Sequence, residues 1–284
     1  MDIATNIFFI DMVFQARQVI RSVPPFHGAR WSAFFRYVCR QGKIPMEQAI
    51  LGILPFRSGR RLIQKGESMQ IRLLCSDFGV AILNDLVENI RNLPTYGEFD
   101  AKRLQLLDIR DGLNDRNGIK STIPETFTKF DIAHCVDECT HLAACSQWHI
   151  VFYCPLRLKC PSTKDTPSFE KMFFCTADFF RQIPYASQHL LSHVRYVEHP
   201  DASYGFTIQS DSLSWVDMRY SRDRKIALGG LYGELLCEGS LSRDAATLLV
   251  LGQYLGCGKN PRFGLGWWRI PELDPVRNIH LPGD

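Results

Sequence analysis

The sequence lacks an apolar run long enough to cross a membrane. A spanning helix needs about twenty predominantly apolar residues, whereas the longest apolar stretch, 245–256, covers about twelve positions and contains Gln253. The N-terminus has no basic leader, and Asp11 interrupts its apolar residues, so we expect no secretory signal. Without such a signal, the ten cysteines are typical of reduced thiols. We therefore expect a cytoplasmic protein that does not bind membranes.

The sequence also lacks the two common glycine motifs that bind nucleotides. A Walker A loop has a glycine five residues before its Gly-Lys-Ser/Thr. That place before Gly258-Lys259 is held by Gln253, and Asn260 replaces the hydroxyl residue. A dinucleotide fingerprint would need a third glycine at position 261, which is a proline. These spacings exclude a mononucleotide or dinucleotide site of either known type.

Overall charge is small, at +3, but its distribution along the chain is uneven. Residues 17–72 hold eleven Lys/Arg against two acidic residues, a net of +9, and residues 219–269 hold eight against four, a net of +4. Two basic segments can form one surface if the fold brings them together, and a basic surface is typical of nucleic-acid binding. The alternative is a solvated face of scattered charges.

The first part of the chain alternates between strand and helix patterns. With 284 residues, of which 45% are apolar, two medium-sized domains are expected. Residues 29–40 begin after a Pro-Pro-Phe-His-Gly turn and repeat apolar residues at helical spacing. The full order is strand, helix, strand, helix, strand, at 7–14, 29–40, 69–75, 79–92 and 99–110.

A second series of elements follows a polar segment. Strands are expected at 148–159, 213–221, 226–236 and 264–270, and helices at 177–197 and 242–255. The order predicts an α+β protein with two tandem ferredoxin-like (RRM-like) βαββαβ domains. No internal sequence repeat is visible, so the duplication rests on element order. The expected domains are 1–112, a linker with a Cys/His-rich insertion at 113–147, and 148–284.

The C-terminal third is rich in glycine between Gly229 and Gly266. Glycine allows close backbone approach, so such a loop can direct several N–H groups toward an anion. The pattern is Gly229-Gly230-x-x-Gly233-Glu234, Gly239, a helix, Gly252-Gln253, and Gly258-Lys259 leading to Phe263-Gly264-Leu265-Gly266. Over about the last seventy residues, it resembles the CRISPR-associated endoribonucleases that process precursor CRISPR RNA, within the RAMP superfamily.

This resemblance implies a tandem ferredoxin-like protein that binds CRISPR repeat RNA, cuts it once and needs no metal or other cofactor. In that family the ribose 2′-OH attacks the adjacent phosphate, leaving a 2′,3′-cyclic phosphate and a 5′-OH. Such a reaction needs a base for the 2′-OH, an acid for the departing oxygen, and donors on the phosphorane. The partners implied are precursor and mature CRISPR RNA and other CRISPR effector subunits.

His27 is the candidate catalytic residue. It lies in the turn before the first helix, where family members often carry the catalytic histidine, and a helix N-terminus favours anions. Histidine can act as a base or an acid near neutral pH. Arg30 or Lys43 would face the developing charge, and Tyr37 would position the ribose or the nucleophile. The alternative is that His27 only caps the helix or fills a turn.

RNA contacts are expected at the glycine-rich loop. Backbone N–H groups and two cations would hold phosphates, which positions RNA without reading its sequence. The expected residues are Gly256, Gly258, Lys259, Arg262 and Gly264. A second basic run, Arg57, Arg60 and Arg61, would contact a stem or flank of the RNA, or else form a charged exposed loop. Of Trp267 and Trp268, at most one is expected to be free to stack on a base.

A Cys/His cluster precedes the second set of elements. It comprises Cys135, Cys139, His141 and Cys145. Zinc sites use such ligands, but the gaps here are wider than the usual two residues between paired cysteines. The cluster is either a structural zinc site, a set of buried or surface thiols, or a surface for a partner protein.

Two other functions remain open from the sequence. A non-catalytic RAMP subunit would bind guide RNA in a CRISPR effector complex with the same glycine loop, without needing His27. An unrelated enzyme with a phosphate-bearing ligand would bind a small nucleotide and no repeat RNA.

Overall fold

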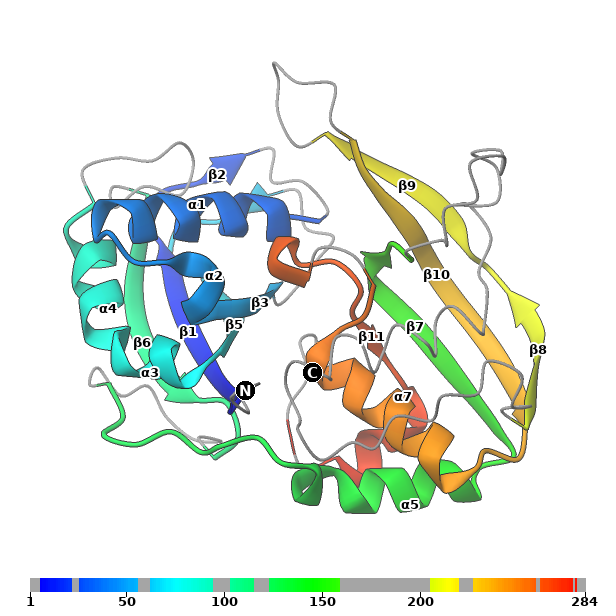
Figure 1. Ribbon diagram of the computed structural model, residues 1–284. Coiled ribbons are helices and arrows are strands. Elements are labelled where there is room, and N and C mark those ends of the chain that lie inside the picture. The colour runs from blue at the N-terminus through cyan, green and yellow to red at the C-terminus, as the bar shows by residue number, and fades with distance from the viewer. Residues whose placement is uncertain are drawn as a thin grey trace, which may run out of the picture. The chain divides into compact units, whose positions relative to one another are not determined.

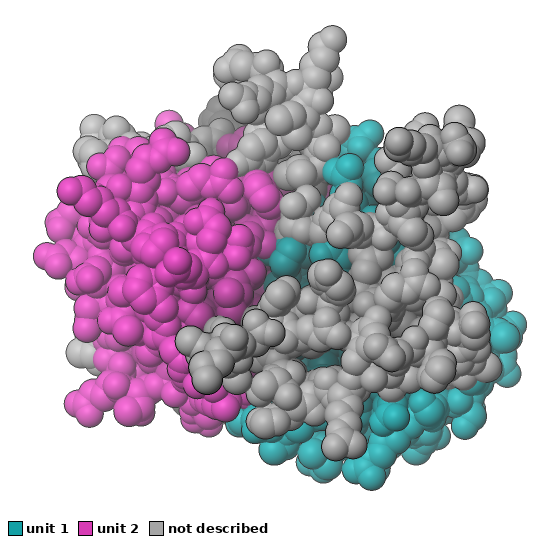
Figure 2. Space-filling model, in the orientation of Figure 1, with its two compact units in different colours: residues 1–4, 131–261, 265–281 teal, residues 5–130, 262–264, 282–284 magenta. Residues whose placement is uncertain are grey.

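The computed structural model describes residues 6–21, 26–55, 62–93, 103–114, 123–158, 205–219, 227–258, 261–277 and 279. The chain divides into two compact units (Figure 2). The N-terminal unit comprises residues 5–130, 262–264 and 282–284, and the C-terminal unit comprises 1–4, 131–261 and 265–281. The predicted site residues Arg57, Arg60, Arg61 and Lys259, and the predicted helix 177–197, lie outside the described residues.

A four-stranded antiparallel sheet forms the base of the N-terminal unit (Figure 1). Its strands, in spatial order, are β3 (Ile50–Pro55), β5 (Ser68–Cys75), β1 (Phe8–Ala16) and β6 (Leu104–Asp111). The first strand of the chain therefore lies between the third and fourth strands of this sheet, as in a ferredoxin-like βαββαβ unit. A short separate pair joins β2 (Ile20–Arg21) to β4 (Leu62–Ile63).

The helices of this unit follow its first and third sheet strands. They are α1 (Gly28–Gln41), α2 (Met46–Ala49), α3 (Asp77–Ala81) and α4 (Leu83–Arg91). The predicted helix 79–92 is two helices, because Ile82 leaves helical geometry at φ −100° and ψ 10°. Ser76 starts α3: its Oγ accepts a hydrogen bond from the Gly79 N–H at 3.1 Å, which satisfies one of the free N–H groups of the first turn.

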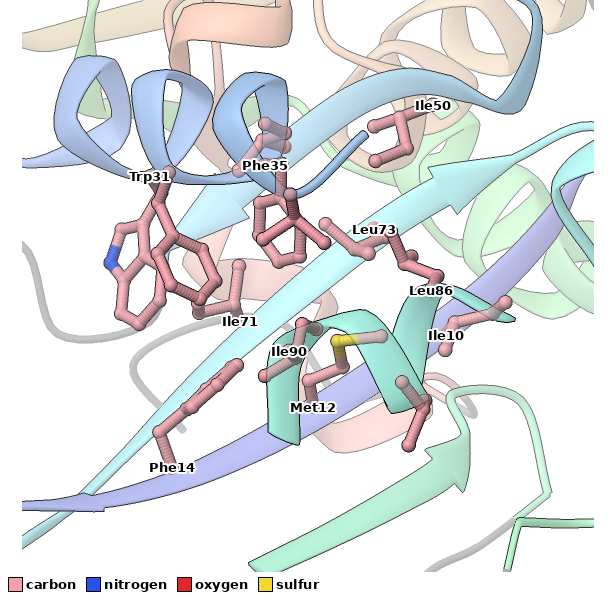
Figure 3. Close-up of a cluster of buried hydrophobic side chains, with 14 of the residues drawn as sticks. Ile10, Met12, Phe14, Trp31, Phe35, Ile50, Ile71, Leu73, Leu86 and Ile90 are labelled. Atoms are coloured by element: carbon pink, nitrogen blue, oxygen red, sulfur yellow. The ribbon is translucent and has the colours of Figure 1, made fainter. Parts of the chain in front are cut away.

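The core of the unit lies between the sheet and helices α1 and α4 (Figure 3). Alternate residues of β1, beginning with Ile10 and Met12, point to this face because strand side chains alternate. From α1, Phe34 and Phe35 are 2% and 0% exposed and belong to this core. Each such buried side chain contributes about 1.5–3 kcal/mol to folding.

Strand β3 was not predicted from the sequence. Its six residues include Gly52 and end at Pro55, and both residue types weaken a strand pattern. The register with β5 shifts between Ile50 and Gly52, so the strand accommodates its glycine in a bulge. Its position at the edge of the sheet tolerates Pro55, which has no N–H to donate.

A buried ion pair joins the two central strands of this sheet. Asp11 of β1 lies opposite Arg72 of β5, and the side chains form two hydrogen bonds, Nε to Oδ1 at 2.7 Å and Nη2 to Oδ2 at 2.8 Å. Asp11 is 4% exposed and Arg72 is 1% exposed. Nη2 also donates to the Gly112 carbonyl oxygen at 3.2 Å. This bidentate geometry compensates both charges for the loss of water.

The C-terminal unit repeats the same strand order. Its antiparallel sheet runs β11 (Trp268–Arg269), β7 (Gln147–Leu156), β10 (Ala227–Gly239), β8 (Phe206–Asp211). The long strand β10 pairs with β8 over one part and with β9 (Ser214–Arg219) over the other. If β8 and β9, which pair with successive parts of β10, are counted as one position, the first sheet strand again lies between the third and the fourth. The protein therefore has two tandem ferredoxin-like units, as predicted.

The helices of the C-terminal unit extend beyond the predicted boundary. They are η1 (Ile132–Cys135), α5 (Val136–Ala144), α7 (Arg243–Leu255) and η4 (Pro271–Val276). Helix α5 packs on α7 and η4, and the units divide between Phe130 and Asp131. Residues 132–144, in the second half of the expected insertion 113–147, therefore form helices that belong to the C-terminal unit. The sequence pattern did not predict these helices, because the segment is polar and rich in Cys and His.

Candidate functional site

The glycine-rich loop begins where α7 ends. Ser242 starts α7 by accepting a hydrogen bond from the Ala245 N–H at 3.2 Å, and Gly256 ends it at a positive φ of 73°. The Trp267 ring lies against Gly256, 3.2–3.3 Å from where a Cβ would stand. The absent side chain thus leaves room for the indole as well as allowing the turn.

A buried carboxylate fixes the end of α7 from the side of α5. Glu138 is 0% exposed and accepts hydrogen bonds from Gln253 Nε2 and Tyr254 Oη, both at 2.7 Å. Burial, followed by the Glu138 charge, raises the pKa of Tyr254, so its hydroxyl stays protonated and donates. The last turn before the loop is therefore held in place by a charge-assisted network.

The next part of the loop closes on strand β7. The Cys257 N–H donates to the Gly266 carbonyl oxygen, and the Gly266 N–H donates to that of Pro155, both at 2.9 Å. A Cβ on Gly258 would stand 2.4 Å from the Arg157 carbonyl oxygen. Gly256 and Gly258 are therefore required by the packing of the loop itself. Their predicted RNA contacts remain predictions.

Three residues of the loop pack in the N-terminal unit. Arg262 donates from Nε to the Ile50 carbonyl oxygen and from Nη2 to that of Glu47, each at 2.9 Å. Phe263 lies below the guanidinium of Arg36, 5.8 Å from its carbon to the ring centroid, which is a cation–π distance. The Arg262 side chain was predicted to hold a phosphate; in the structure it binds two backbone carbonyls.

The same three residues reach the start of α1. A Cβ on Gly28 would stand 2.4 Å from the Phe263 carbonyl oxygen and 2.7 Å from the Gly264 Cα. Only glycine at position 28 allows this approach of two backbones. Since Gly28 directly follows His27, Phe263 and Gly264 of the glycine-rich loop lie beside the segment of the N-terminal unit that carries the candidate catalytic histidine.

His27 occupies the N-cap position of α1 without capping it through its side chain. Its φ and ψ are −95° and 7°, and its carbonyl oxygen accepts from the N–H groups of Arg30 and Trp31 at 3.0 and 3.1 Å. The imidazole is 3% exposed, and its Nδ1 lies 2.9 Å from the donating indole Nε1 of Trp31. Side-chain capping, one of the two structural roles left open by the sequence, is therefore not what this histidine does.

The three predicted partners of His27 lie at different distances along α1. Arg30 is half-buried in the first turn. Tyr37 is partly buried against the core, and Lys43 is exposed just beyond the C-terminal end of the helix. A helix of 14 residues is about 20 Å long. Lys43 therefore lies too far along the helix axis to face the same phosphate as His27, and the role of Arg30 stays a prediction.

The Cys/His cluster does not assemble into a metal site. Among the described residues, which include all four of these side chains, no group of three or more His, Cys, Asp or Glu is placed to hold a metal ion. Cys135 and Cys139 are buried, while His141 is exposed on α5. Burial raises the pKa of both thiols and keeps them protonated, as in a hydrophobic core.

Two further features bear on RNA binding. Trp267 and Trp268 are both 0% exposed, so neither offers a ring for base stacking, which agrees with the expectation that at most one of them is free. Trp31, Gly28 and Phe263 were not singled out from the sequence, although Trp31 stands four residues from His27, the spacing of neighbours on a helix.

Within the described residues, no helix has the length and apolar character to span a membrane.

The strand order of both units defines the class of protein: an α+β protein with two tandem ferredoxin-like units. Residues 150–268 match the family described as CRISPR-associated endoribonuclease Cas6, which confirms the resemblance carried by the glycine pattern.

Solved structures extend the likeness to nearly the whole chain. A chain of a partial Cas6–RT–Cas1–Cas2 complex aligns with a TM-score of 0.70 and 16% identity over 95% of this chain and 47% of that chain. A chain of a Cas6–RT–Cas1–Cas2 complex gives the same values, with 29% of that chain covered. A Cas6 of Thermus thermophilus aligns with a TM-score of 0.54 and 12% identity over 94% of this chain and 99% of that one.

The chain thus spans less than half of the length of the first two matched chains and nearly all of the Thermus protein. At these identities the likeness establishes the fold. No curated protein matches the sequence.

Proposed function

We propose that this protein is a metal-independent endoribonuclease that binds CRISPR repeat RNA and cleaves precursor CRISPR RNA. The 2′-OH attacks the adjacent phosphorus and the bond to the 5′ oxygen breaks, leaving a 2′,3′-cyclic phosphate and a 5′-OH. The 2′-OH loses its proton and the departing oxygen gains one, so no water or metal enters the step.

The single observation that carries the proposal is the approach of Gly264 to Gly28 beside His27. Residues 262–264, which lie within the segment that matches the Cas6 family, belong to the same compact unit as the start of α1. A helix N-terminus offers free N–H groups to a phosphate, and α1 has no acidic residue in its first turn to compete for them. Arg30, in the same turn, supplies a cation for the charge that develops on the phosphate.

The test is an incubation of the full chain with its cognate repeat RNA in EDTA. We expect one cut per repeat, with a cyclic phosphate on the upstream fragment and a free 5′-OH on the downstream fragment. His27→Ala abolishes the cut, and His141→Ala, which changes an exposed histidine on α5, leaves it intact. Cleavage that requires a divalent cation, or that leaves a 5′-phosphate, would contradict the proposed chemistry.

A second candidate function has one observation in its favour. His27 is 3% exposed and its Nδ1 is already bonded to Trp31, which suits a structural histidine. The protein would then be a non-catalytic RAMP subunit that binds guide RNA within a CRISPR effector complex. Tight binding of repeat RNA without cleavage, unchanged in His27→Ala, would support this function and reject the first.

Association with other CRISPR proteins is part of the proposal under either function. Its support is that chains matched at a TM-score of 0.70 come from complexes containing Cas1 and Cas2. Mixing the full chain with purified Cas1 and Cas2 from the same genome, followed by size-exclusion chromatography, tests it. Co-elution at micromolar concentrations is the expected result, and separate elution at that concentration counts against it.

A further inference from the structure

Trp215 differs in exposure from the other tryptophans of the chain. The sequence has five tryptophans, and four of them are 0% exposed: Trp31, Trp148, Trp267 and Trp268. Trp215, on strand β9 of the C-terminal unit, is partly exposed, although an indole is one of the largest apolar surfaces that a protein can bury. Tryptophan is enriched where proteins contact their partners. The exposed ring therefore calls for a ligand.

Trp215 stands where the β9–β10 hairpin leaves the sheet. Strand β10 pairs with β9 from Ala227 to Tyr232, but with β7 only from Leu231 onward. Figure 1 shows the two hairpin strands extending past the end of β7. Trp215 lies opposite Leu231, the residue at which the pairing with β7 ends. From there toward the turn, the hairpin has only two strands among those that the structure describes.

Two contacts within the hairpin hold the indole. Its Nε1 donates a hydrogen bond to Asp217 Oδ1 at 2.8 Å. Gly229 lies opposite Asp217, and a Cβ on Gly229 would stand 2.7 Å from both Nε1 and Cζ2 of the ring. The indole therefore occupies the space of the missing side chain, and any side chain at position 229 would displace it. Because the ring is already ordered, its binding to a ligand costs little conformational entropy.

The connection between the two strands carries a positive charge. Residues 220–226 read Tyr-Ser-Arg-Asp-Arg-Lys-Ile, so three cations and one acid give a net charge of +2. Proteins hold single-stranded nucleic acid with this combination, in which cations attract the phosphates and an aromatic ring stacks on a base. The hairpin also lies within residues 150–268, which match the Cas6 family. Both observations favour RNA over a protein as the ligand of the exposed ring.

We infer that Trp215 is a stacking platform for an unpaired base of the repeat RNA, and that Asp217 is a positioning residue that fixes the indole. The inference rests on the proposed function for the identity of the RNA, but it requires only binding and no cleavage. Every base has a π-face, so the platform supplies affinity and does not read sequence. Bases within a stem stack on one another, so the ligand is a single-stranded part of the repeat.

The contact is measured on the full chain by tryptophan fluorescence during a titration with repeat RNA. Acrylamide quenches exposed rings far more than buried ones, so the accessible emission comes from Trp215, and its loss in Trp215→Phe assigns it. We expect bound RNA to quench this emission and to shield the ring from acrylamide. RNA binding that leaves the accessible emission unchanged would overturn the inference, and would leave the ring as a cover for Gly229 or a contact for a protein.

The energetic consequence is measured as the affinity for repeat RNA at several salt concentrations. Trp215→Ala should weaken binding by about 5- to 150-fold, the range for the loss of one stacked base. The slope of log affinity against log salt concentration should not change, because no phosphate contact is lost. Trp215→Phe, which keeps a ring, should bind within about fivefold of the wild type.

The matched control is Phe78→Ala, which removes a ring that is 39% exposed on α3 of the N-terminal unit. It should bind repeat RNA within about twofold of the wild type, since a scattered exposed ring contributes little to binding. If Trp215→Ala binds as tightly as Phe78→Ala, the inference is wrong.

Asp217 is tested by two variants that both remove its charge. Asp217→Asn keeps a side-chain oxygen that accepts the indole N–H, whereas Asp217→Ala does not. We expect Asp217→Asn to bind RNA at least as tightly as the wild type, and Asp217→Ala to bind about fivefold more weakly than Asp217→Asn, the size of one hydrogen bond. Equal affinities of the two variants would show that this hydrogen bond does not position the ring.

The inference and the proposed function fail in different ways. If the chain binds repeat RNA without cutting it, the proposed nuclease is wrong, and the Trp215 measurements still decide the platform. If the chain cuts the RNA and Trp215→Ala binds it like the wild type, the inference is wrong and the nuclease stands. If Trp215→Ala does not fold, the wild-type emission and Trp215→Phe decide. A chain that binds no repeat RNA rejects both.

Discussion

The backbones of Gly28 and Gly264 meet so closely that a Cβ on Gly28 would stand 2.7 Å from the Gly264 Cα. Real Cβ atoms do not approach backbone atoms to that distance, so one of the two segments would have to move. The contact joins the residue after His27 to the loop that carries the family's glycine pattern. Hence the position of the loop beside the helix N-terminus depends on a missing side chain.

We expect Gly28→Ala to destabilise the protein by about 1–3 kcal/mol and to impair RNA cleavage, because the added methyl displaces the Phe263–Gly264 backbone. Alanine otherwise favours a helix by up to about 1 kcal/mol over glycine, so a net loss identifies the clash as its cause. The measurement is urea unfolding, with Gly66→Ala as the control. Gly66 has nothing within 4 Å of its Cβ position, and only its φ of 83° opposes the change. A Gly28→Ala protein as stable as the wild type would mean that the loop does not pack there.

Arg262 provides a second test of the same contact. Replacing it with alanine removes its hydrogen bonds to the Ile50 and Glu47 carbonyl oxygens and should cost about 1.5–3 kcal/mol of the free energy of unfolding. Lysine at this position should recover less than half of the loss, because it has no planar pair of donors.

The salt dependence of RNA binding separates this structural role from a phosphate contact. When a protein loses one phosphate contact, the slope of log affinity against log salt concentration becomes smaller in magnitude by about one. An Arg262→Ala protein with the wild-type slope has lost only its carbonyl contacts. A slope that is smaller in magnitude by about one would show that Arg262 also contacts a phosphate, as the sequence pattern predicts.

The positions of Arg30 in α1 and of Lys43 beyond its C-terminal end predict effects of different size on cleavage. Arg30 lies in the first turn with His27, and Lys43 lies beyond the other end of a helix about 20 Å long. Arg30→Ala should lower the single-turnover rate by about tenfold or more, as expected for a cation near the reacting phosphate. Lys43→Ala should leave that rate within about twofold, since no direct contact is possible over this distance. A larger effect of Lys43→Ala than of Arg30→Ala would place the scissile phosphate elsewhere.

The Asp11–Arg72 pair predicts a large effect on stability. Arg72→Ala leaves the Asp11 carboxylate buried without its cation, which should destabilise the protein by about 3–5 kcal/mol. The control is Arg269→Ala, which breaks a more exposed pair with Asp274 and should cost about 0–1 kcal/mol. Unfolding in urea measures both. If the two variants lose the same stability, the buried pair does not hold β1 to β5 as the structure indicates.

Local sequence patterns predicted the elements that have strong periodicity. Helix α1 and strands β1 and β5 were expected within one or two residues, because their apolar residues repeat at the helical or strand period. Strand β3 was missed because Gly52 and Pro55 interrupt its pattern. Helix α5 was missed because its cysteines and histidine resemble metal ligands more than a packing face.

The site was only partly predictable, since its contacts join distant parts of the chain. Arg262 binds the carbonyl oxygen of a residue 212 positions away, and no local pattern encodes such a contact. The family resemblance identified His27 and the loop separately, and only the fold shows that they meet. The Trp31–His27 bond was accessible in principle, because a donor four residues after a histidine on a helix is a local feature.

The most direct test of the account is the single-turnover rate of repeat RNA cleavage in EDTA by the wild type and by His27→Ala, with RNA affinity measured in parallel. We expect His27→Ala to lower the cleavage rate by about 10²- to 10⁴-fold and to leave RNA affinity nearly unchanged. This is the usual size of the effect when a side chain acts on the proton or the charge in the transition state. Equal rates for the two proteins would show that the histidine beside the glycine-rich loop does not take part in cleavage.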